Sequence, residues 1–301
     1  MINGNTELIA HIGFPTFSFK SPMIYNPYFE SAGIDAVVVP FGCRPPEYPA
    51  LLRALFALSN IRGALITMPH KIATFDLVDE ASAAARIAGA CNAVRRLPDG
   101  RLQGDVFDGE GFVRGVRRKG VQLEGASALV LGAGGVGCAI AASLAGAGIA
   151  HIALFDVRSE SAHALARRLQ AEYPALRIEV GSTDPAGHQV VVNATPLGMY
   201  PEDPLPLDVG RIDTGAIVGD VVMAVEMTPL LRAAQSRGCA IQVGSDMLFE
   251  QIPAYLEFFG LPTTTPDRLR ALARLDAAEA SPGMRADTAS VAVKAEVSLH
   301  P

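Results

Sequence analysis

The stretch from 126 to 156 most constrains the fold, because it joins two short apolar runs through a glycine-rich turn. Residues 128–131 form the first run, 138–147 are small and suit a helix, and 152–155 form a second run that ends on Asp156. The turn between the first run and the helix reads Gly132, Ala133, Gly134, Gly135, Val136 and Gly137. This G-x-G-x-x-G order, with an acid about 20 residues further on, predicts a βαβ unit that binds a dinucleotide.

Three of the glycines in this turn meet a steric requirement of dinucleotide binding. Gly132 permits the tight turn, Gly134 lets backbone amides approach a pyrophosphate, and Gly137 lets the helix press on its strand. The helix N-terminus supplies partial positive charge to phosphates. A lone glycine pattern is weak evidence in a chain with 29 glycines, and the alternative is a glycine-rich turn in another α/β fold. The flanking strands and Asp156 favour dinucleotide binding.

Length and charge narrow the class of protein. The 301 residues suffice for one large domain or two ordinary ones, and half are apolar. A net charge of -6 gives no reason to expect nucleic acid or an anionic membrane as partner. The four cysteines are too widely spaced for a metal site and suit a reducing compartment. With no signal sequence visible at the start, we expect a soluble, cytoplasmic protein without a metal.

The first hundred residues alternate between strand and helix patterns. The predicted strands are 8–12, 36–40 and 63–68, with a hairpin of 91–97 and 101–104. The predicted helices are 22–32, 48–58 and 78–87. This alternation predicts an N-terminal α/β unit with a mostly parallel sheet covered by helices.

The rest of the chain continues the pattern around the glycine turn. The further predicted strands are 177–180, 190–192, 217–222 and 241–243. The predicted helices are 110–119, 159–172 with Ser159 as its cap, 228–237, and 247–259, which closes the ordered part. We therefore expect a Rossmann-type, doubly wound unit, followed by a disordered tail over 278–301.

Six motifs together resemble the shikimate dehydrogenase family, over roughly residues 8 to 260. They are 13–15 (GFP) with 20–22 (KSP), 67–71 (TMPHK), 89–92 (GACN), 104–109 (GDVFDG), 193–199 (NATPLGM) and 244–251 (GSDMLFEQ). Any one is weak, but six in the family's order around a dinucleotide turn are specific. The resemblance implies a substrate-binding catalytic domain over 1–108, joined by a C-terminal helix within 239–275, and a cofactor domain over 109–238.

The resemblance also implies hydride transfer between a nicotinamide and a ring hydroxyl, with Lys71 and Asp108 at the reacting carbon. Reducing a ketone needs a proton donor at its oxygen, and oxidation needs the reverse, which a lysine oriented by an aspartate can supply. His70 is a competing acid or base, because its ordinary pKa lies near neutrality. It replaces the aromatic residue that family members usually carry there, and a packing or surface role is favoured.

The substrate residues divide into retained and altered sets. By resemblance, Thr67, Asn92 and Gln251 hold ring hydroxyls. Family members grip the substrate carboxylate with two serines and a tyrosine; Ser21 fits one serine, but Phe19 and Met223 occupy the other two positions. Leu65 likewise replaces an asparagine, and Ser18 beside Phe19 should point the opposite way in an extended segment. We infer a divergent member acting on shikimate, quinate or a related alicyclic hydroxy compound.

The cofactor is expected to be NAD rather than NADP. NADP-preferring relatives carry Asn-Arg-Thr after the second strand, whereas this chain has Asp156, Val157 and Arg158. A carboxylate there accepts hydrogen bonds from the ribose hydroxyls and repels a 2′-phosphate. Besides the glycine turn, Asp156 and Arg158, the residues implied at the cofactor are Asn193, Ala194, Thr195, Pro196, Met199, Val221 and Gly244.

Two other functions remain open at this point. One is a lysine-dependent dehydrogenase of similar architecture acting on a folate, disfavoured because the segments around Asp108 and Gln251 follow the shikimate pattern. The other is a nucleotide-binding sensor without turnover, against which the retained Lys71 and Asp108 argue. The expected partner is a small-molecule substrate, and the oligomeric state stays open, a homodimer included.

Overall fold

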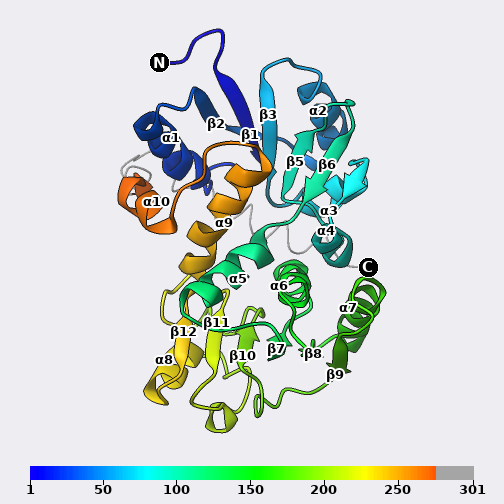
Figure 1. Ribbon diagram of the computed structural model, residues 1–301, viewed down its shortest axis with the longest axis vertical. Helices are drawn as coiled ribbons and strands as arrows, with labels where there is room; N and C mark the ends of the chain where they lie inside the picture. Colours follow the sequence, from blue (N-terminus) through cyan, green and yellow to red (C-terminus); the bar gives the residue numbers. More distant parts are fainter. Residues whose placement is uncertain (276–301) are drawn as a thin grey trace.

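The structure is a computed structural model that describes residues 1–275. It contains two six-stranded sheets, which Figure 1 shows one above the other with helices α5 and α9 running between them. Within residues 1–275, none of the helices is both long and apolar enough to cross a membrane.

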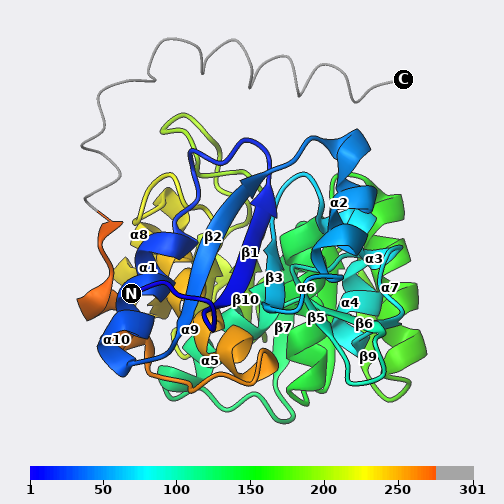
Figure 2. The same ribbon diagram turned by 90° about the horizontal axis from the view of Figure 1, so that it is seen from above.

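The first sheet has the strand order β2-β1-β3-β5-β6-β4. Its strands are β1 (Glu7–Gly13), β2 (Ala36–Gly42), β3 (Ile61–Ile66), β4 (Glu80–Ala81), β5 (Ala93–Arg96) and β6 (Leu102–Asp105). Strand β1 runs parallel to β2 and β3, while β5 is antiparallel to β3 and β6. The helices of this half are α1 (Ser21–Ala32), α2 (Tyr48–Leu55), α3 (Lys71–Phe75) and α4 (Ala83–Ala88). Figure 2 shows α1 and α2 on opposite sides of the β2–β1–β3 strands.

The second sheet is parallel throughout, with the order β12-β11-β10-β7-β8-β9. Its strands are β7 (Ser127–Leu131), β8 (His151–Phe155), β9 (Arg177–Val180), β10 (Val190–Asn193), β11 (Ile217–Asp220) and β12 (Ala240–Gln242). The helices of this half are α5 (Asp108–Arg118), α6 (Gly135–Gly146), α7 (Ser159–Glu172) and α8 (Pro229–Ser236). The last two helices, α9 (Gly244–Phe258) and α10 (Pro266–Leu272), pack in the cluster of α1 in the first half. Counted from β7, the order is 3-2-1-4-5-6, the Rossmann arrangement.

Strand alternation explains how both sheets are covered. In β7, Ala128 and Val130 belong to the cluster that includes side chains of α5, α6 and α7, while Leu129 and Leu131 pack in the cluster that includes α8. Both faces are therefore buried, as parallel strands require. In β1, Ile9 faces the cluster of α1 and α9, and its neighbours along the strand face that of α2. Residue 11 lies on the same face as Ile9.

Several sequence-based expectations are wrong in detail. The predicted helix over 78–87 contains strand β4 and then α4, because the Ser82 side chain accepts from the Ala85 N–H and starts the helix only there. Helix α7 has Arg158 at its N-cap position without a side-chain cap, so Ser159 is its first residue. Helices α3 and α10 were not predicted, and α10 follows the helix that was expected to close the ordered part. The predicted tail over 278–301 lies outside the described residues.

Candidate active site

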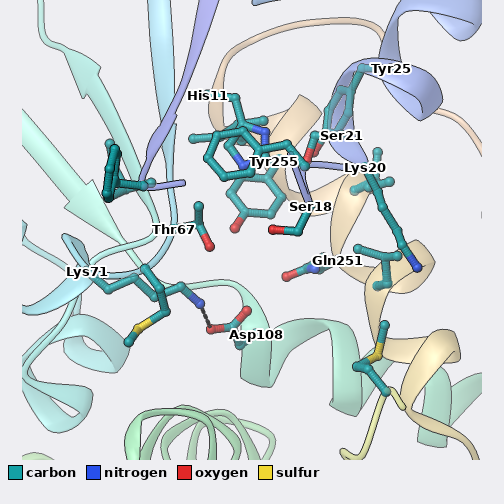
Figure 3. A pocket seen from close by; sticks show the side chains of 18 of the residues that line it. His11, Ser18, Lys20, Ser21, Tyr25, Thr67, Lys71, Asp108, Gln251 and Tyr255 are labelled. Atoms are coloured by element: carbon teal, nitrogen blue, oxygen red, sulfur yellow. Dashed lines mark hydrogen bonds and ion pairs between the residues drawn. The ribbon is translucent and has the colours of Figure 1, made fainter. Parts of the chain in front are cut away.

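A pocket of about 450 Å³ opens where β1 and β3 end, between that edge of the first sheet and helix α9. Parallel strands expose their carboxyl ends at one edge of a sheet, which is where ligands bind in open α/β folds. The volume suits a small organic molecule. Figure 3 shows the polar side chains of its wall converging on a common space.

One wall carries an ion pair between Lys71 and Asp108, whose Nζ and Oδ2 atoms lie 2.6 Å apart. Lys71 begins α3, directly after the segment that follows β3, and Asp108 begins α5. A carboxylate in the first turn of a helix is favoured by the helix dipole. The side chains retain 23% and 12% exposure, so the pair is desolvated but open to the pocket.

The same pair lies next to the helix of the glycine turn. Gly109 follows Asp108, and a Cβ there would meet the backbone oxygen of Ala139 in α6 at 2.0 Å. Only a glycine allows α5 to approach α6 this closely. This contact brings the N-terminus of α5, and with it Asp108, against the dinucleotide-type unit.

Asn92 is not among the residues that line the pocket, and the substrate-binding role implied for it stays a prediction. It is buried, and its Oδ1 accepts from the Phe107 N–H at 2.9 Å, immediately before Asp108. Its Nδ2 has no hydrogen-bond partner among residues 1–275. The side-chain amide of Asn92 therefore fixes the backbone at the start of α5, and through that backbone it positions Asp108.

Thr67 and Gln251 line the pocket, and their role in holding ring hydroxyls stays a prediction. The Oε1 atom of Gln251 is buried without a partner in the described part of the chain. Figure 3 also shows Tyr255 of α9 directing its hydroxyl toward Thr67, a residue for which the sequence offered no signal beyond its place in a helix. These three side chains offer hydrogen bonds beside the ion pair.

Other side chains of the pocket wall are apolar. Phe19, Leu65 and Met223, the three substituted positions, all line it, as does Ser21 at the start of α1. Ser18 lines it as well, contrary to expectation. The segment is a turn rather than extended chain, since the N–H of residue 19 donates to the carbonyl of residue 16 at 3.0 Å, so neighbouring side chains can reach the same space.

His11 is the polar residue of this wall that the sequence analysis missed. It is 7% exposed and lines the pocket, and its ring stacks on Phe19 with centroids 4.1 Å apart. Its Nδ1 has no partner within residues 1–275. Burial, and then the charge of Lys71, lower the pKa of His11 from 6.5 to about 4, so the ring is uncharged at neutral pH. In the sequence, the one feature that could have indicated His11 is that a polar residue occupies a core-facing position of a strand.

His70 is a packing residue, in agreement with the favoured interpretation. It is 1% exposed, its Nε2 lies 2.8 Å from the carbonyl oxygen of Cys43, and its ring stacks on Tyr48 at 4.0 Å. Burial lowers its pKa, partly offset by the Cys43 carbonyl. His70 is not among the pocket residues.

The glycine turn has the geometry of a phosphate cradle. Gly132 has a φ of 96°, and a Cβ on Gly137 would lie 1.9 Å from the Gly132 oxygen, so both positions require glycine. A Cβ on Gly134 or Gly135 would meet nothing within 4 Å. No side chain caps the N-terminus of α6. Open space over free amides at a helix N-terminus fits the pyrophosphate of a dinucleotide.

Asp156 is tied to this cradle. Its Oδ2 accepts from the Ala133 N–H at 2.7 Å, and its Oδ1 accepts from the Arg158 N–H at 2.9 Å. The carboxylate is 10% exposed, whereas the Arg158 side chain is 75% exposed, with its Nε 3.9 Å from Asp156 Oδ1. The carboxylate thus lies beside the turn, and the guanidinium is mostly in solvent, at the limit of ion-pair distance from that carboxylate.

The loop after β10 lies against the turn, since the Ala194 N–H donates to the Leu131 carbonyl at 2.7 Å. Asn193 is buried and faces inward: its Nδ2 donates to Leu197 and Asp220, and its Oδ1 accepts from Thr195. It shapes the loop rather than presenting its side chain to the cleft. Of the other residues implied at the cofactor, Pro196 and Met199 are exposed, Ala194, Thr195 and Val221 are half-buried, and Gly244 is buried against Val222.

Known proteins match this chain along most of its length. The family model "Shikimate dehydrogenase substrate binding domain" matches residues 12–94, and "ThiF family" matches 114–173. A protein of Acidiphilium cryptum named shikimate dehydrogenase (NADP(+)) is 38% identical over 272 residues, 89% of this chain and 96% of its own.

Solved structures agree. Shikimate 5-dehydrogenase of Listeria monocytogenes, in complex with shikimate and NAD, superposes with a TM-score of 0.83 at 27% identity, covering 90% of this chain and 97% of its own. The 5-ketofructose reductase of Gluconobacter sp. strain CHM43 gives 0.81 at 25% identity, covering 90% and 98%. Fold, motif order and identity over nearly the whole of both chains agree: the chain belongs to the shikimate dehydrogenase family.

Proposed function

We propose that this protein catalyses the reversible, nicotinamide-dependent oxidation of a ring hydroxyl of shikimate, quinate or a related alicyclic hydroxy compound. The observation that carries the proposal is the Lys71–Asp108 ion pair, 2.6 Å between Nζ and Oδ2, at the edge of a small-molecule pocket and beside helix α6. The membership of this chain in the shikimate dehydrogenase family supports the same class of reaction.

The residues have separate tasks in this reaction. A nicotinamide cofactor, which the glycine turn and Asp156 would hold through its dinucleotide part, would supply the hydride acceptor for oxidation and the hydride donor for reduction. In its neutral amine form Lys71 accepts the hydroxyl proton as the ketone forms, and the resulting ammonium gives the proton back when the ketone is reduced. Asp108 accepts a hydrogen bond from Lys71 and keeps its amine directed into the pocket. The two residues form one acid–base unit.

Hydroxyl groups next to the reacting carbon would be held by Thr67, Gln251 and Tyr255. The Gln251 Oε1 is buried without a partner among residues 1–275. A buried acceptor that forms no hydrogen bond lowers the stability of the fold by about 1–3 kcal/mol. A substrate hydroxyl that donates to it removes this cost. Asn92 acts as a positioning residue, because its contact is with the backbone that carries Asp108.

For the cofactor, we propose a preference for NAD. The support is Asp156, whose carboxylate lies beside the glycine turn where the adenine ribose of a dinucleotide sits. Two negative charges about 4 Å apart repel by roughly 4 kcal/mol at an effective dielectric of about 20, before screening. The NADP(+) in the names of the curated relatives points the other way, and Arg158 is free to turn toward a 2′-phosphate. We therefore propose a preference and not an absolute exclusion.

The variant Asp156→Asn tests the preference, because the amide oxygen keeps an acceptor for a backbone N–H while the charge is removed. We expect the ratio of kcat/KM for NAD to that for NADP to fall about 10-fold, and Arg158→Ala to raise it. Equal kcat/KM with both cofactors in the wild-type protein would refute the preference.

The function itself is tested by following nicotinamide reduction with a panel of cyclic hydroxy compounds that includes shikimate and quinate. We expect substrate-dependent NADH formation with at least one, and its loss in Lys71→Ala. Tight dinucleotide binding with no turnover of any compound in either direction would favour the nucleotide-binding sensor instead.

A further inference from the structure

The pocket wall across from the Lys71–Asp108 pair contains three side chains that lie together: His11, Leu65 and Phe19. His11 and Leu65 are register partners on the adjacent strands β1 and β3, so their side chains stand together on one face of the sheet. Phe19 covers His11 by stacking, at 4.1 Å between ring centroids. All three line the pocket, and Figure 3 shows His11 across the space from Lys71 and Asp108.

The three side chains of this wall offer little to an anion, and the neighbouring Ser18 and Ser21 of the pocket can donate only neutral hydroxyl hydrogen bonds. Leu65 is 4% exposed and, like Phe19, has no donor. A carboxylate buried without charge-assisted hydrogen bonds is strongly disfavoured. Helix α1 does not compensate, because Pro22 has no N–H and the Met23 N–H already donates to the Lys20 carbonyl at 3.1 Å.

The charged groups of the pocket do not change this. Lys71 is engaged by Asp108. Lys20 is exposed, and Figure 3 shows its amine turned away from the ion pair. An exposed ammonium pairs weakly with a carboxylate. His11 is uncharged at neutral pH, because burial and the nearby Lys71 lower its pKa to about 4.

A neutral imidazole can still donate one hydrogen bond and accept another. The Nδ1 of His11 is buried without a partner among residues 1–275, although buried polar atoms are nearly always satisfied. A hydroxyl satisfies such an atom in either tautomer, since it donates and accepts. A carboxylate satisfies only a donor.

We propose that His11 is a specificity-determining residue, and that the pocket takes a polyhydroxy alcohol or ketone whose end remote from the reacting carbon is an uncharged hydroxyl and not a carboxylate. The inference rests on the proposed function and narrows its substrate class. Lys71 and Asp108 carry out the same proton transfer, while His11 hydrogen-bonds the terminal hydroxyl. Phe19 and Leu65 exclude water from that contact.

The first test compares shikimate with its hydroxymethyl analogue, in which –CH₂OH replaces the carboxylate and the ring is unchanged. We expect kcat/KM of the wild-type protein to be at least about 10-fold higher for the analogue, and 5-ketofructose, a neutral polyhydroxy ketone, to be reduced. A higher kcat/KM for shikimate than for the analogue would overturn the proposal.

The second test assigns the preference to His11. His11→Phe keeps a planar ring against Phe19 but removes both nitrogens, and we expect it to raise KM for the hydroxymethyl analogue about 10-fold, more than for shikimate. His11→Asn, which restores a donor and an acceptor, should recover part of the loss. An unchanged KM in a His11→Phe protein with wild-type thermal stability would remove His11 from recognition.

Calorimetric binding of the same two compounds to the wild-type protein separates this proposal from the proposed function. If these two compounds and the rest of the panel are all left unchanged in both directions, the dehydrogenase assignment fails. Tighter binding of the hydroxymethyl analogue would still support the neutral-end site, and tighter binding of shikimate would refute it.

Discussion

The two ends of the pocket differ in what they retain and what they have exchanged. At one end, Lys71, Asp108 and Gln251 keep the polar side chains that the shikimate dehydrogenase pattern carries, and the Lys71–Asp108 ion pair has a length of 2.6 Å. At the other, Phe19 and Leu65 fill two polar positions of the pattern beside the retained Thr67, and Met223, at a third such position, lines the pocket next to Gly244. A fold can thus keep the groups that carry out a reaction while changing those that select the molecule.

The largest expected effect is at the catalytic end. Lys71→Ala removes the group that moves the proton, and kcat should fall by at least about 10²-fold. Dinucleotide affinity should stay near that of the wild type, because Lys71 is outside the glycine-turn unit. Steady-state kinetics and dinucleotide titration check both. Lys20→Ala, at the exposed lysine of the same pocket, is the matched control and should cost far less.

Asp108→Asn should also lower kcat, by about 10- to 10²-fold, because an amide is a poorer partner for the Lys71 ammonium. If the pair acts as one unit, the double variant with Lys71→Ala should be hardly slower than the slower single variant. A double-mutant cycle in kcat measures this. If the fold losses in kcat of the two single variants multiply in the double variant, Lys71 and Asp108 have independent roles.

A smaller effect is expected at the altered end. Phe19→Ser together with Met223→Tyr introduces two hydroxyls at positions where the resemblance implies a carboxylate-binding site. KM for shikimate should fall about 10-fold, the effect expected of one charge-assisted hydrogen bond. Phe19→Ala with Met223→Phe changes the same positions without adding hydroxyls. If this control improves KM equally, added space and not the hydroxyls is the cause.

The smallest effect is expected at His70, which is not among the pocket residues. His70→Phe keeps an aromatic ring against Tyr48 and loses the hydrogen bond to the Cys43 carbonyl, 2.8 Å in length. Stability should drop by about 1 kcal/mol, seen in thermal unfolding, while kcat changes less than about 3-fold. A collapse of turnover in His70→Phe with Lys71→Ala still active would move the acid–base role to His70.

Elements with strong local patterns could be predicted, and those set by tertiary contacts could not. The turn from Gly132 to Gly137 was predictable because two of its glycines are sterically required there. Short elements such as α3 and β4 carry no periodicity of their own. Ser18 was misplaced because its turn depends on a backbone hydrogen bond that the residue types do not announce.

The same distinction holds in the site. Lys71 and Asp108 belong to motifs and could be predicted as a pair before their distance was known. Asn92 belongs to a motif too, but its side chain is directed at the Phe107 N–H, which only the fold reveals. His11 stands alone in an apolar strand, and its neighbours Leu65 and Phe19 are distant in sequence. Recognition residues that depend on such neighbours need the structure.

The most direct test of the division between the two ends is to measure kcat and KM for shikimate side by side in Lys71→Ala and in the Phe19→Ser, Met223→Tyr double variant. The account predicts a loss in kcat with KM little changed in the first, and a fall in KM with kcat little changed in the second. A double variant that changes kcat and not KM, or a Lys71→Ala protein that changes KM alone, would contradict it.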